Sequence, residues 1–281
     1  MDRRTFMLGA AAFVAACSRP GNETVAAGNP NVPPLGVQLY SVRDLMAQDV
    51  AATLDLVASA GFEEVEFAGY FEHSPARMRA MLGAAGLAAP AAHIAKDLFE
   101  ADLDRLIADA AEIGHEYVIV PWLKDTERSL DDYRRHAADF NRYGEACAAA
   151  GIGFAYHNHA WEFDETEGEI PYDLLLRETD PDLVRMELDL AWAVAGDADP
   201  VAYFTAWPGR FPMVHLKDLR AGEEADIGTG VVDFDTILAH ADIAGLEHGF
   251  VERDNANDPG ASLRTNYDAM RPIWTKYIGR E

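Results

Sequence analysis

Imidazole and carboxylate side chains recur in the second half of the chain at a spacing that could bring them together. His157, Asp189, His215 and Glu252 follow four apolar runs and are separated by 32, 26 and 37 positions. Each interval is about the length of one strand, one helix and their connections, the repeat of a parallel β/α fold. Mixed imidazole and carboxylate ligands suit divalent ions such as Mn²⁺, Mg²⁺, Zn²⁺ or Co²⁺. The four side chains therefore predict a metal site.

The first of these residues lies in the stretch FAYHNHAWEF, which holds His157, His159 and Glu162 within six positions. Alternation along an extended strand turns His157 and His159 to the same side. Either His157 is itself a metal ligand, or Glu162 reaches back from the following loop to take that position. The competing interpretation is that the stretch forms only the polar edge of a surface loop.

Eight short apolar runs recur along the chain and predict the strands that would carry these residues. Such runs are typical of parallel strands that are buried on both faces. They cover residues 35–40, 63–67, 87–93, 117–122, 152–157, 183–189, 211–216 and 248–252.

Segments of helical period lie between the runs. Residues 49–61, 102–114 and 131–151 each begin near an aspartate and finish at a glycine, the residue types expected at the two ends of a helix. Residues 258–279 supply the last helix. Eight alternations without a long linker predict one α/β domain over residues 35–281, a closed (β/α)8 TIM barrel. Because reactive groups of such barrels lie at the C-terminal ends of the strands, the predicted ligands would share one rim.

Further polar and aromatic residues end or follow the predicted strands and are candidates for contact with a substrate. Trp122 and Trp192 either stack on a substrate ring or serve only in packing. Lys217 lies two residues beyond His215, where it either bonds a substrate oxygen or only pairs with a nearby carboxylate. The residues expected to bind substrate are Gln38, Tyr40, Glu66, His93, Trp122 and Trp192.

The formal net charge of −25 at pH 7 limits the partners of the protein. A strongly acidic surface repels phosphodiester backbones and anionic membranes, so we expect no nucleic acid partner and a small neutral substrate. Much of this charge also serves to keep the domain soluble. The sequence predicts no particular oligomeric state.

The first 34 residues are expected to lie outside the barrel. Arg3 and Arg4 precede the apolar stretch FMLGAAAFVAA, which is too short for a permanent membrane span and resembles a twin-arginine export signal. The residues VAAC resemble a lipobox that ends at Cys17. We therefore expect a signal peptide over residues 1–17, a flexible tether over residues 18–34, and an exported, periplasmic protein anchored to a bacterial membrane only through lipid on the cysteine. The alternative is an ordinary secretory peptide with an incidental cysteine.

Several motifs, taken in order, resemble those of one family. They are VQLYSVRD, VEFAGY, YHNHAWEF, MELDLAW, VHLKD, GTGVVDF and VERD. This set is similar to the sugar phosphate isomerase/epimerase family of xylose-isomerase-like barrels, which also includes inosose dehydratases and apurinic endonucleases. The family's ligands, Glu, Asp, His and Glu at the ends of strands five to eight, imply Asp189, His215 and Glu252 here. The first position departs from the pattern, because many relatives have ENH where this chain has HNH with His157.

The resemblance implies an enzyme that uses one divalent metal ion, with Mn²⁺ expected first and Mg²⁺, Co²⁺ or Zn²⁺ as alternatives. The ion would polarise the carbonyl of a keto sugar while a base removes the adjacent proton. Glu252 or Glu162 is the candidate base, His157 or His159 the second proton donor, and Lys217 a hydrogen-bond donor to a substrate oxygen.

We therefore expect a sugar isomerase or epimerase. The alternatives are a lyase or hydrolase of 3-keto glycosides on the same fold, and a sugar-binding lipoprotein without catalysis. A metal-dependent phosphodiesterase ranks last, because such sites need several metal ions and a basic groove, whereas this chain shows one plausible ligand set and a strongly negative charge balance.

Overall fold

The computed structural model of the protein describes residues 33–278. The predicted signal peptide, the predicted lipidation site Cys17 and nearly all of the predicted tether lie outside the described residues, so these remain predictions. Within residues 33–278, no helix is both long and apolar enough to cross a lipid bilayer.

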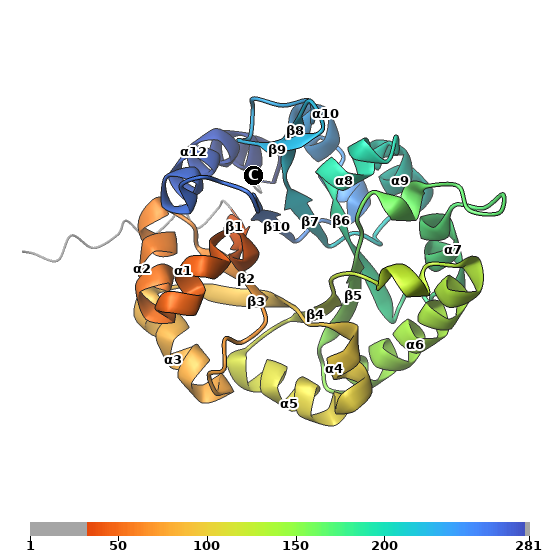
Figure 1. Cartoon of the computed structure of the whole chain (residues 1–281), viewed down its shortest axis with the longest axis horizontal. Coiled ribbons are helices and arrows are strands. Elements are labelled where there is room, and N and C mark those ends of the chain that lie inside the picture. The colour runs from red at the N-terminus through yellow and green to blue at the C-terminus, as the bar shows by residue number, and fades with distance from the viewer. Residues whose placement is uncertain (1–32, 279–281) are drawn as a thin grey trace, which may run out of the picture. The chain divides into compact units, whose positions relative to one another are not determined.

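Eight parallel strands close into a barrel, and helices surround it (Figure 1). Strands follow chain order around the barrel, and the ring closes where Gly36 and Val37 pair with Phe250 and Val251. All eight predicted strands are present, which confirms the TIM barrel. The strands are β1 (Gly36–Gln38), β2 (Glu64–Ala68), β3 (Ala88–His93), β4 (Tyr117–Val120), β5 (Gly153–His157), β6 (Val184–Asp189), β7 (Met213–Leu216) and β10 (His248–Val251).

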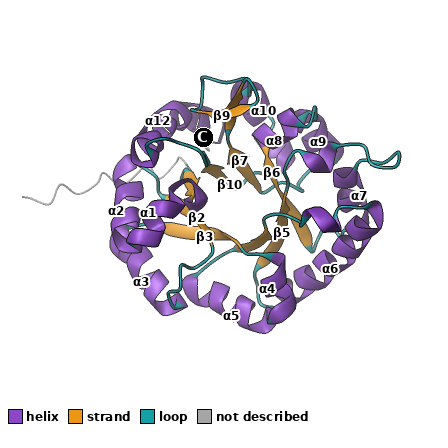
Figure 2. Ribbon diagram, in the orientation of Figure 1, coloured by secondary structure: helices purple, strands orange, loops and turns teal. Residues whose placement is uncertain are grey.

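Figure 2 shows the helices as an outer ring around the strands. Asp49 and Asp102 cap two of them with their carboxylates, and Gly61 and Gly114 end the same two helices in the left-handed conformation, as predicted. The α-helices are α1 (Arg43–Gln48), α2 (Val50–Ala60), α3 (Pro75–Ala85), α4 (Lys96–Ala101), α5 (Leu103–Ile113), α6 (Leu130–Ala149), α7 (Pro171–Glu178), α8 (Leu190–Ala195), α9 (Pro200–Ala206), α10 (Phe234–Leu238), α11 (Ala241–Ala244) and α12 (Pro259–Ile278), with 3₁₀ turns η1 (Leu39–Val42), η2 (Asp125–Glu127) and η3 (Trp161–Phe163).

The long helix α6 differs from the prediction at its start. Its N-cap is Ser129 rather than an aspartate: the serine hydroxyl accepts the backbone N–H of Asp132, and the Asp132 carboxylate accepts the backbone N–H of Ser129. This reciprocal capping box provides acceptors for two backbone N–H groups, whereas a lone aspartate at the N-cap would provide an acceptor for one of them.

A small hairpin, β8 (Asp218–Arg220) and β9 (Glu223–Ala225), follows β7 and was not predicted. The buried carboxylate of Asp218 accepts backbone N–H groups from Gly228, Gly230 and Val232 and so fastens the next loop beneath it. This arrangement explains the GTG motif, in which a Cβ on Gly230 would lie 2.2 Å from the Asp218 carboxylate. The hairpin directly follows β7, the strand that carries the predicted ligand His215.

The interior of the barrel is filled by a thin apolar layer below the polar strand ends. Gly36 makes room for the ring of Phe250, because a Cβ there would lie 2.4 Å from a ring carbon. The layer is apolar and fully buried, so it gives the polar groups above it an environment of low dielectric constant. Its members are Ala91, Ile119, Ala155, Met213 and Phe250.

The close approach of α6 to the segment before β6 generates a stability prediction. A Cβ on Gly144 would lie 2.4 Å from the carbonyl oxygen of Leu183. We expect Gly144→Ala to destabilise the protein by about 1–3 kcal/mol, because overpacking against backbone outweighs the better helix propensity of alanine. Gly83→Ala in α3 is the control: its Cβ would meet nothing within 4 Å, so we expect a gain of up to about 1 kcal/mol. Urea unfolding of both variants measures the difference, and equal behaviour would contradict the packing argument.

Candidate metal centre and substrate pocket

The four predicted metal ligands meet at the C-terminal end of the barrel. Each of His157, Asp189, His215 and Glu252 offers a ligand atom, and these atoms all lie within 4.8 Å of one another. Parallel pairing produces the meeting: Asp189 and His215 are partners in register on β6 and β7, and Glu252 directly follows β10. All four side chains are buried. We call this group the upper cluster.

Two ligand atoms of the upper cluster lack a hydrogen-bond partner among the described residues. His157 donates from Nδ1 to the carbonyl of Pro121 at 3.0 Å, which leaves Nε2 free to bind a metal. Asp189 caps α8 with Oδ1, which accepts the N–H of Trp192 at 2.8 Å, and its Oδ2 has no partner. The free Nε2 and Oδ2 atoms lie 3.6 Å apart. A backbone partner on the second nitrogen of a histidine is the usual arrangement in metal sites, so these residues fit a divalent cation.

The structure does not bring Glu162 into the upper cluster. Its carboxylate accepts the hydroxyl of Tyr156 and, at 2.8 Å, the backbone N–H of His159, so it fastens the loop after β5. Burial raises the pKa of Glu162. Of the two alternatives for the first ligand position, the geometry therefore favours His157.

Lys217 lies beside the upper cluster and is buried among carboxylates. Its Nζ is 2.9 Å from Glu252, 3.2 Å from Asp254, 3.4 Å from Glu224 on the hairpin and 3.6 Å from Asp189. Burial acts to lower the pKa of Lys217, but these negative charges raise it well above its ordinary value. The lysine is therefore a fixed positive charge.

The crowding of negative charge also acts on the carboxylates. Burial and the charge of Glu252 raise the pKa of Asp254 to about 8. Burial acts to raise the pKa of Glu252 as well, but the charges of Lys217 and His215 hold it well below its ordinary value. Glu252 is thus ionised at neutral pH.

A pocket of about 670 Å³ opens above the upper cluster. Tyr40 and Trp122 line it with 46% and 45% of their surface exposed, and the Arg43 guanidinium stacks on one face of the Tyr40 ring. Burial lowers the pKa of His159 to about 2, with a further contribution from His157, so this pocket histidine is neutral. The predicted site residues that line the pocket are Tyr40, His93, Trp122, His157, His159, Lys217 and Glu252.

The other predicted substrate residues lie outside the pocket lining. The ring centroids of Trp192 and His159 lie 6.1 Å apart, and the Trp192 ring centroid lies 5.0 Å from Nζ of Lys217. Trp192 therefore packs against two residues of the site without lining the pocket. Gln38 is fully buried and donates to Glu66 at 2.6 Å.

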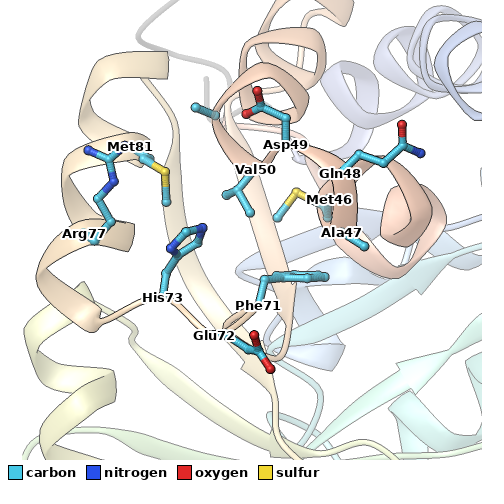
Figure 3. A pocket seen from close by; sticks show the side chains of 11 residues that line it. Met46, Ala47, Gln48, Asp49, Val50, Phe71, Glu72, His73, Arg77 and Met81 are labelled. Atoms are coloured by element: carbon cyan, nitrogen blue, oxygen red, sulfur yellow. The ribbon is translucent and has the colours of Figure 1, made fainter.

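A second hollow, of about 470 Å³, lies between the α1–α2 junction and the loop after β2 (Figure 3). Met46, Phe71, His73 and Arg77 are among its lining side chains, and it shares none with the pocket above the upper cluster. Neither group of convergent metal-ligand atoms in residues 33–278 lies there. The pocket at the strand ends is therefore the candidate active site.

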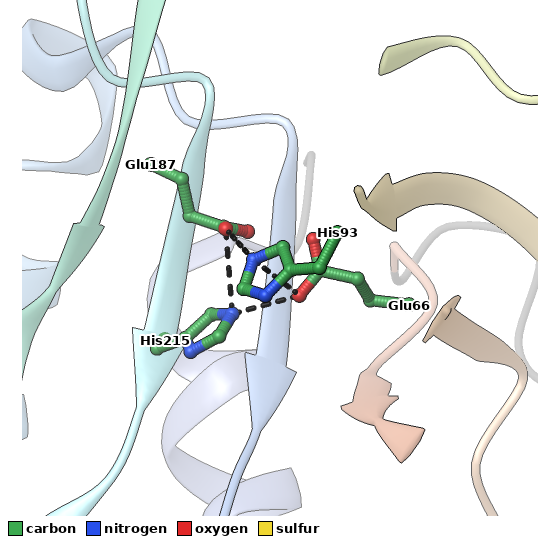
Figure 4. Close-up of side chains that lie close together, drawn as sticks. All are labelled: Glu66, His93, Glu187 and His215. Carbon is green, nitrogen blue, oxygen red and sulfur yellow. Dashed lines mark hydrogen bonds and ion pairs between the residues drawn. The ribbon is translucent and has the colours of Figure 1, made fainter. Parts of the chain in front are cut away.

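A second polar group lies deeper in the barrel and includes a residue that sequence reasoning missed. Glu66, His93, Glu187 and His215 offer ligand atoms within 4.8 Å of one another (Figure 4). We call this group the lower cluster; it shares His215 with the upper one. Glu187 stands two residues before Asp189 on β6, so alternation turns both to the barrel interior. That spacing, and a glutamate that stands between the apolar residues Met186 and Leu188, are the signals that could have revealed it.

The comparisons with known proteins agree with this architecture. Residues 54–271 match the family described as "Xylose isomerase-like TIM barrel", so the chain belongs to that family. A sugar phosphate isomerase/epimerase from Parabacteroides distasonis superimposes with a TM-score of 0.75 at 26% identity, covering 89% of this chain and 99% of that one. A structure of an IOLI protein with a bound zinc atom gives 0.71 at 13% identity, covering 88% and 100%, a likeness that shows the fold alone.

Curated relatives of similar sequence include inosose dehydratases. The enzyme of that name from Geobacillus kaustophilus is 28% identical over 215 residues, which cover 68% of this chain and 66% of the relative. For the inosose dehydratase of Lacticaseibacillus casei the identity is 32% over 96 residues, covering 34% and 31%. The matched regions thus cover two thirds or less of the length of these relatives.

The unpartnered atoms of the upper cluster generate a prediction about metal and stability. A divalent cation that binds only the folded protein stabilises it by about 2.7 kcal/mol at one hundred times its dissociation constant. We expect Mn²⁺ to raise the unfolding temperature of chelator-treated protein and Asp189→Asn to lose most of that rise, because the variant removes a charged ligand atom. Asp182→Asn, exposed near the other end of β6, is the matched control. A full metal response in Asp189→Asn, read by differential scanning fluorimetry, would remove Asp189 from the ligand set.

Proposed function

We propose that the protein is a divalent-metal-dependent enzyme that removes a proton from the carbon beside the carbonyl of a keto sugar, as sugar isomerases and epimerases do. One observation carries the proposal: the free Nε2 of His157 and the free Oδ2 of Asp189 lie 3.6 Å apart beside Glu252, at the base of the pocket. Membership of the xylose isomerase-like family, and relatives named sugar phosphate isomerase/epimerase and inosose dehydratase, support a reaction on a sugar or related polyol ketone.

His157, Asp189, His215 and Glu252 would hold the cation. When bound, it would supply Lewis acidity toward the substrate carbonyl, with Mn²⁺ the ion we expect first. Glu252 lines the pocket as an ionised carboxylate and is the group we assign to accept the proton. Lys217, fixed 2.9 Å away, stays charged and donates a hydrogen bond to a substrate oxygen as negative charge develops there.

The charges of the pocket favour a neutral substrate. Lys217 is the one lysine or arginine among the described residues that line it, and four carboxylates surround its ammonium group. A phosphoryl group usually requires several donors or cations that are not already paired. We therefore place an unphosphorylated keto sugar or keto glycoside in the pocket, with the exposed faces of Tyr40 and Trp122 against its ring.

The reaction that follows proton removal depends on the substrate. Return of a proton to the neighbouring carbon or to the opposite face gives isomerisation or epimerisation, whereas departure of a β-substituent gives elimination. The export signal predicted from the sequence favours substrates that occur outside the cytoplasm, so we retain cleavage of 3-keto glycosides by elimination as the alternative. The net charge of −25 argues against an activity on DNA.

Deuterium exchange tests the proposed chemistry. The full chain, loaded with Mn²⁺, is incubated in D₂O with keto sugars and 3-keto glycosides, and proton NMR follows the hydrogen beside the carbonyl. We expect exchange or product formation that Glu252→Gln slows by at least about 10²-fold, the usual contribution of a general base. Glu223→Gln, an exposed glutamate on the adjacent hairpin, is the control. Metal analysis of both variants separates loss of the base from loss of the ion. Sugar binding without exchange on any substrate would favour a binding protein instead.

The aromatic rim generates a separate prediction. Trp122→Ala removes a ring whose face is available to a sugar. We expect KM to rise about fivefold, equivalent to about 1 kcal/mol of lost contact, with kcat little changed because Trp122 carries no titratable or metal-binding group. Steady-state kinetics on the substrate identified by exchange measures both constants. A fall in kcat with constant KM would contradict a role limited to binding.

A further inference from the structure

The lower cluster has the composition and geometry of a cation site rather than of a simple ion pair. Two carboxylate oxygens and two imidazole nitrogens alternate around it (Figure 4). The Nε2 of His93 lies 2.6 Å from Glu187 and 3.4 Å from Glu66, and the Nε2 of His215 lies 2.7 Å from Glu66 and 3.4 Å from Glu187.

These separations approach those of a tetrahedral metal site. With metal–ligand bonds of 2.0–2.1 Å, adjacent ligand atoms stand about 3.3 Å apart. Two of the four measured separations already have that length. The two shorter ones are hydrogen bonds whose protons a cation would replace.

Hydrogen bonding within the protein does not satisfy the lower cluster. Both carboxylates are fully buried, and Oε1 of Glu66 and Oε1 of Glu187 have no partner among the described residues. The remaining donor to the pair is Gln38, which bonds the other oxygen of Glu66. Two buried carboxylates that face two imidazoles are costly unless a positive charge is shared among them.

We propose that Glu66, His93, Glu187 and Nε2 of His215 form a second divalent-cation site beneath the first. His215 then bridges the two ions, because its Nδ1 faces Glu252 and Asp189 in the upper cluster while its Nε2 faces Glu66 and Glu187. Two nitrogen and two carboxylate ligands suit Zn²⁺ or Co²⁺. The bridging imidazole gives up its ring protons to solvent as the ions bind, and the proton on Nε2 of His93 moves to Nδ1.

The pocket supplies a route to the lower cluster. His93 lines the pocket, and 10% of its side chain is exposed, whereas Glu66 and Glu187 are closed off beneath it. A cation entering from the pocket therefore meets this imidazole first. The proposal concerns metal stoichiometry and does not depend on which reaction the enzyme performs.

Cobalt stoichiometry tests the proposal. The full chain is stripped with a chelator and equilibrated with Co²⁺ by dialysis. Bound metal is then counted by elemental analysis, and the visible absorption of Co²⁺ reports its coordination. We expect two ions per wild-type chain, one in Glu187→Gln and one in Asp189→Asn.

The Co²⁺ counts of the wild type and the variants decide whether the second site exists. One ion in the wild type, whichever variant loses it, overturns the second site, as do two ions that survive in Glu187→Gln. Circular dichroism verifies folding, and His93→Asn carries the same expectation if Glu187→Gln fails to fold. Failure of the deuterium-exchange experiment alone would leave this count unchanged, so the two proposals fail separately.

Discussion

The arrangement of the site depends on one imidazole that both clusters share. His215 is completely buried, with Glu252 at 2.8 Å from Nδ1 and Glu66 at 2.7 Å from Nε2. Burial acts to lower its pKa, but the charges of Glu187 and Glu252 raise it well above the ordinary value. A ring held by carboxylates on both nitrogens has little freedom to rotate. Its orientation therefore fixes the positions of ligands contributed by β2, β6 and β10, which are far apart in the chain.

The connections outside the strands complete this arrangement. The hairpin β8–β9 brings Glu224 to Lys217, and Asp218 anchors the loop that follows by accepting three backbone N–H groups. Glu162 anchors the loop after β5 in the same way, because its carboxylate accepts the backbone N–H of His159. A buried carboxylate therefore anchors each of these loops. The loops and the strand ends together position the residues of the site.

The sequence predicted the parts of the site that follow from strand periodicity. His157, Asp189, His215 and Glu252 end apolar runs, and parallel pairing is enough to bring such residues to one rim. Glu187 was missed because it lies inside the strand rather than at its end, and only alternation along the strand distinguishes its inward direction. The position of Glu162 depends on a short 3₁₀ turn, and the strands of the hairpin have three residues each, so periodicity gives little signal for either.

The charge balance of the two clusters is a physical reason for proposing cations there. The two clusters contain Glu66, Glu187, Asp189 and Glu252, all buried, and the neighbouring lysine within the described part of the chain is Lys217 alone. Protons are a poor substitute, because they neutralise the carboxylates and block the ligand atoms that substrate chemistry requires. Divalent ions neutralise the same charge while keeping those oxygens in place and a Lewis acid available to the pocket. Buried carboxylates arranged in this way are therefore groups that a divalent cation would stabilise.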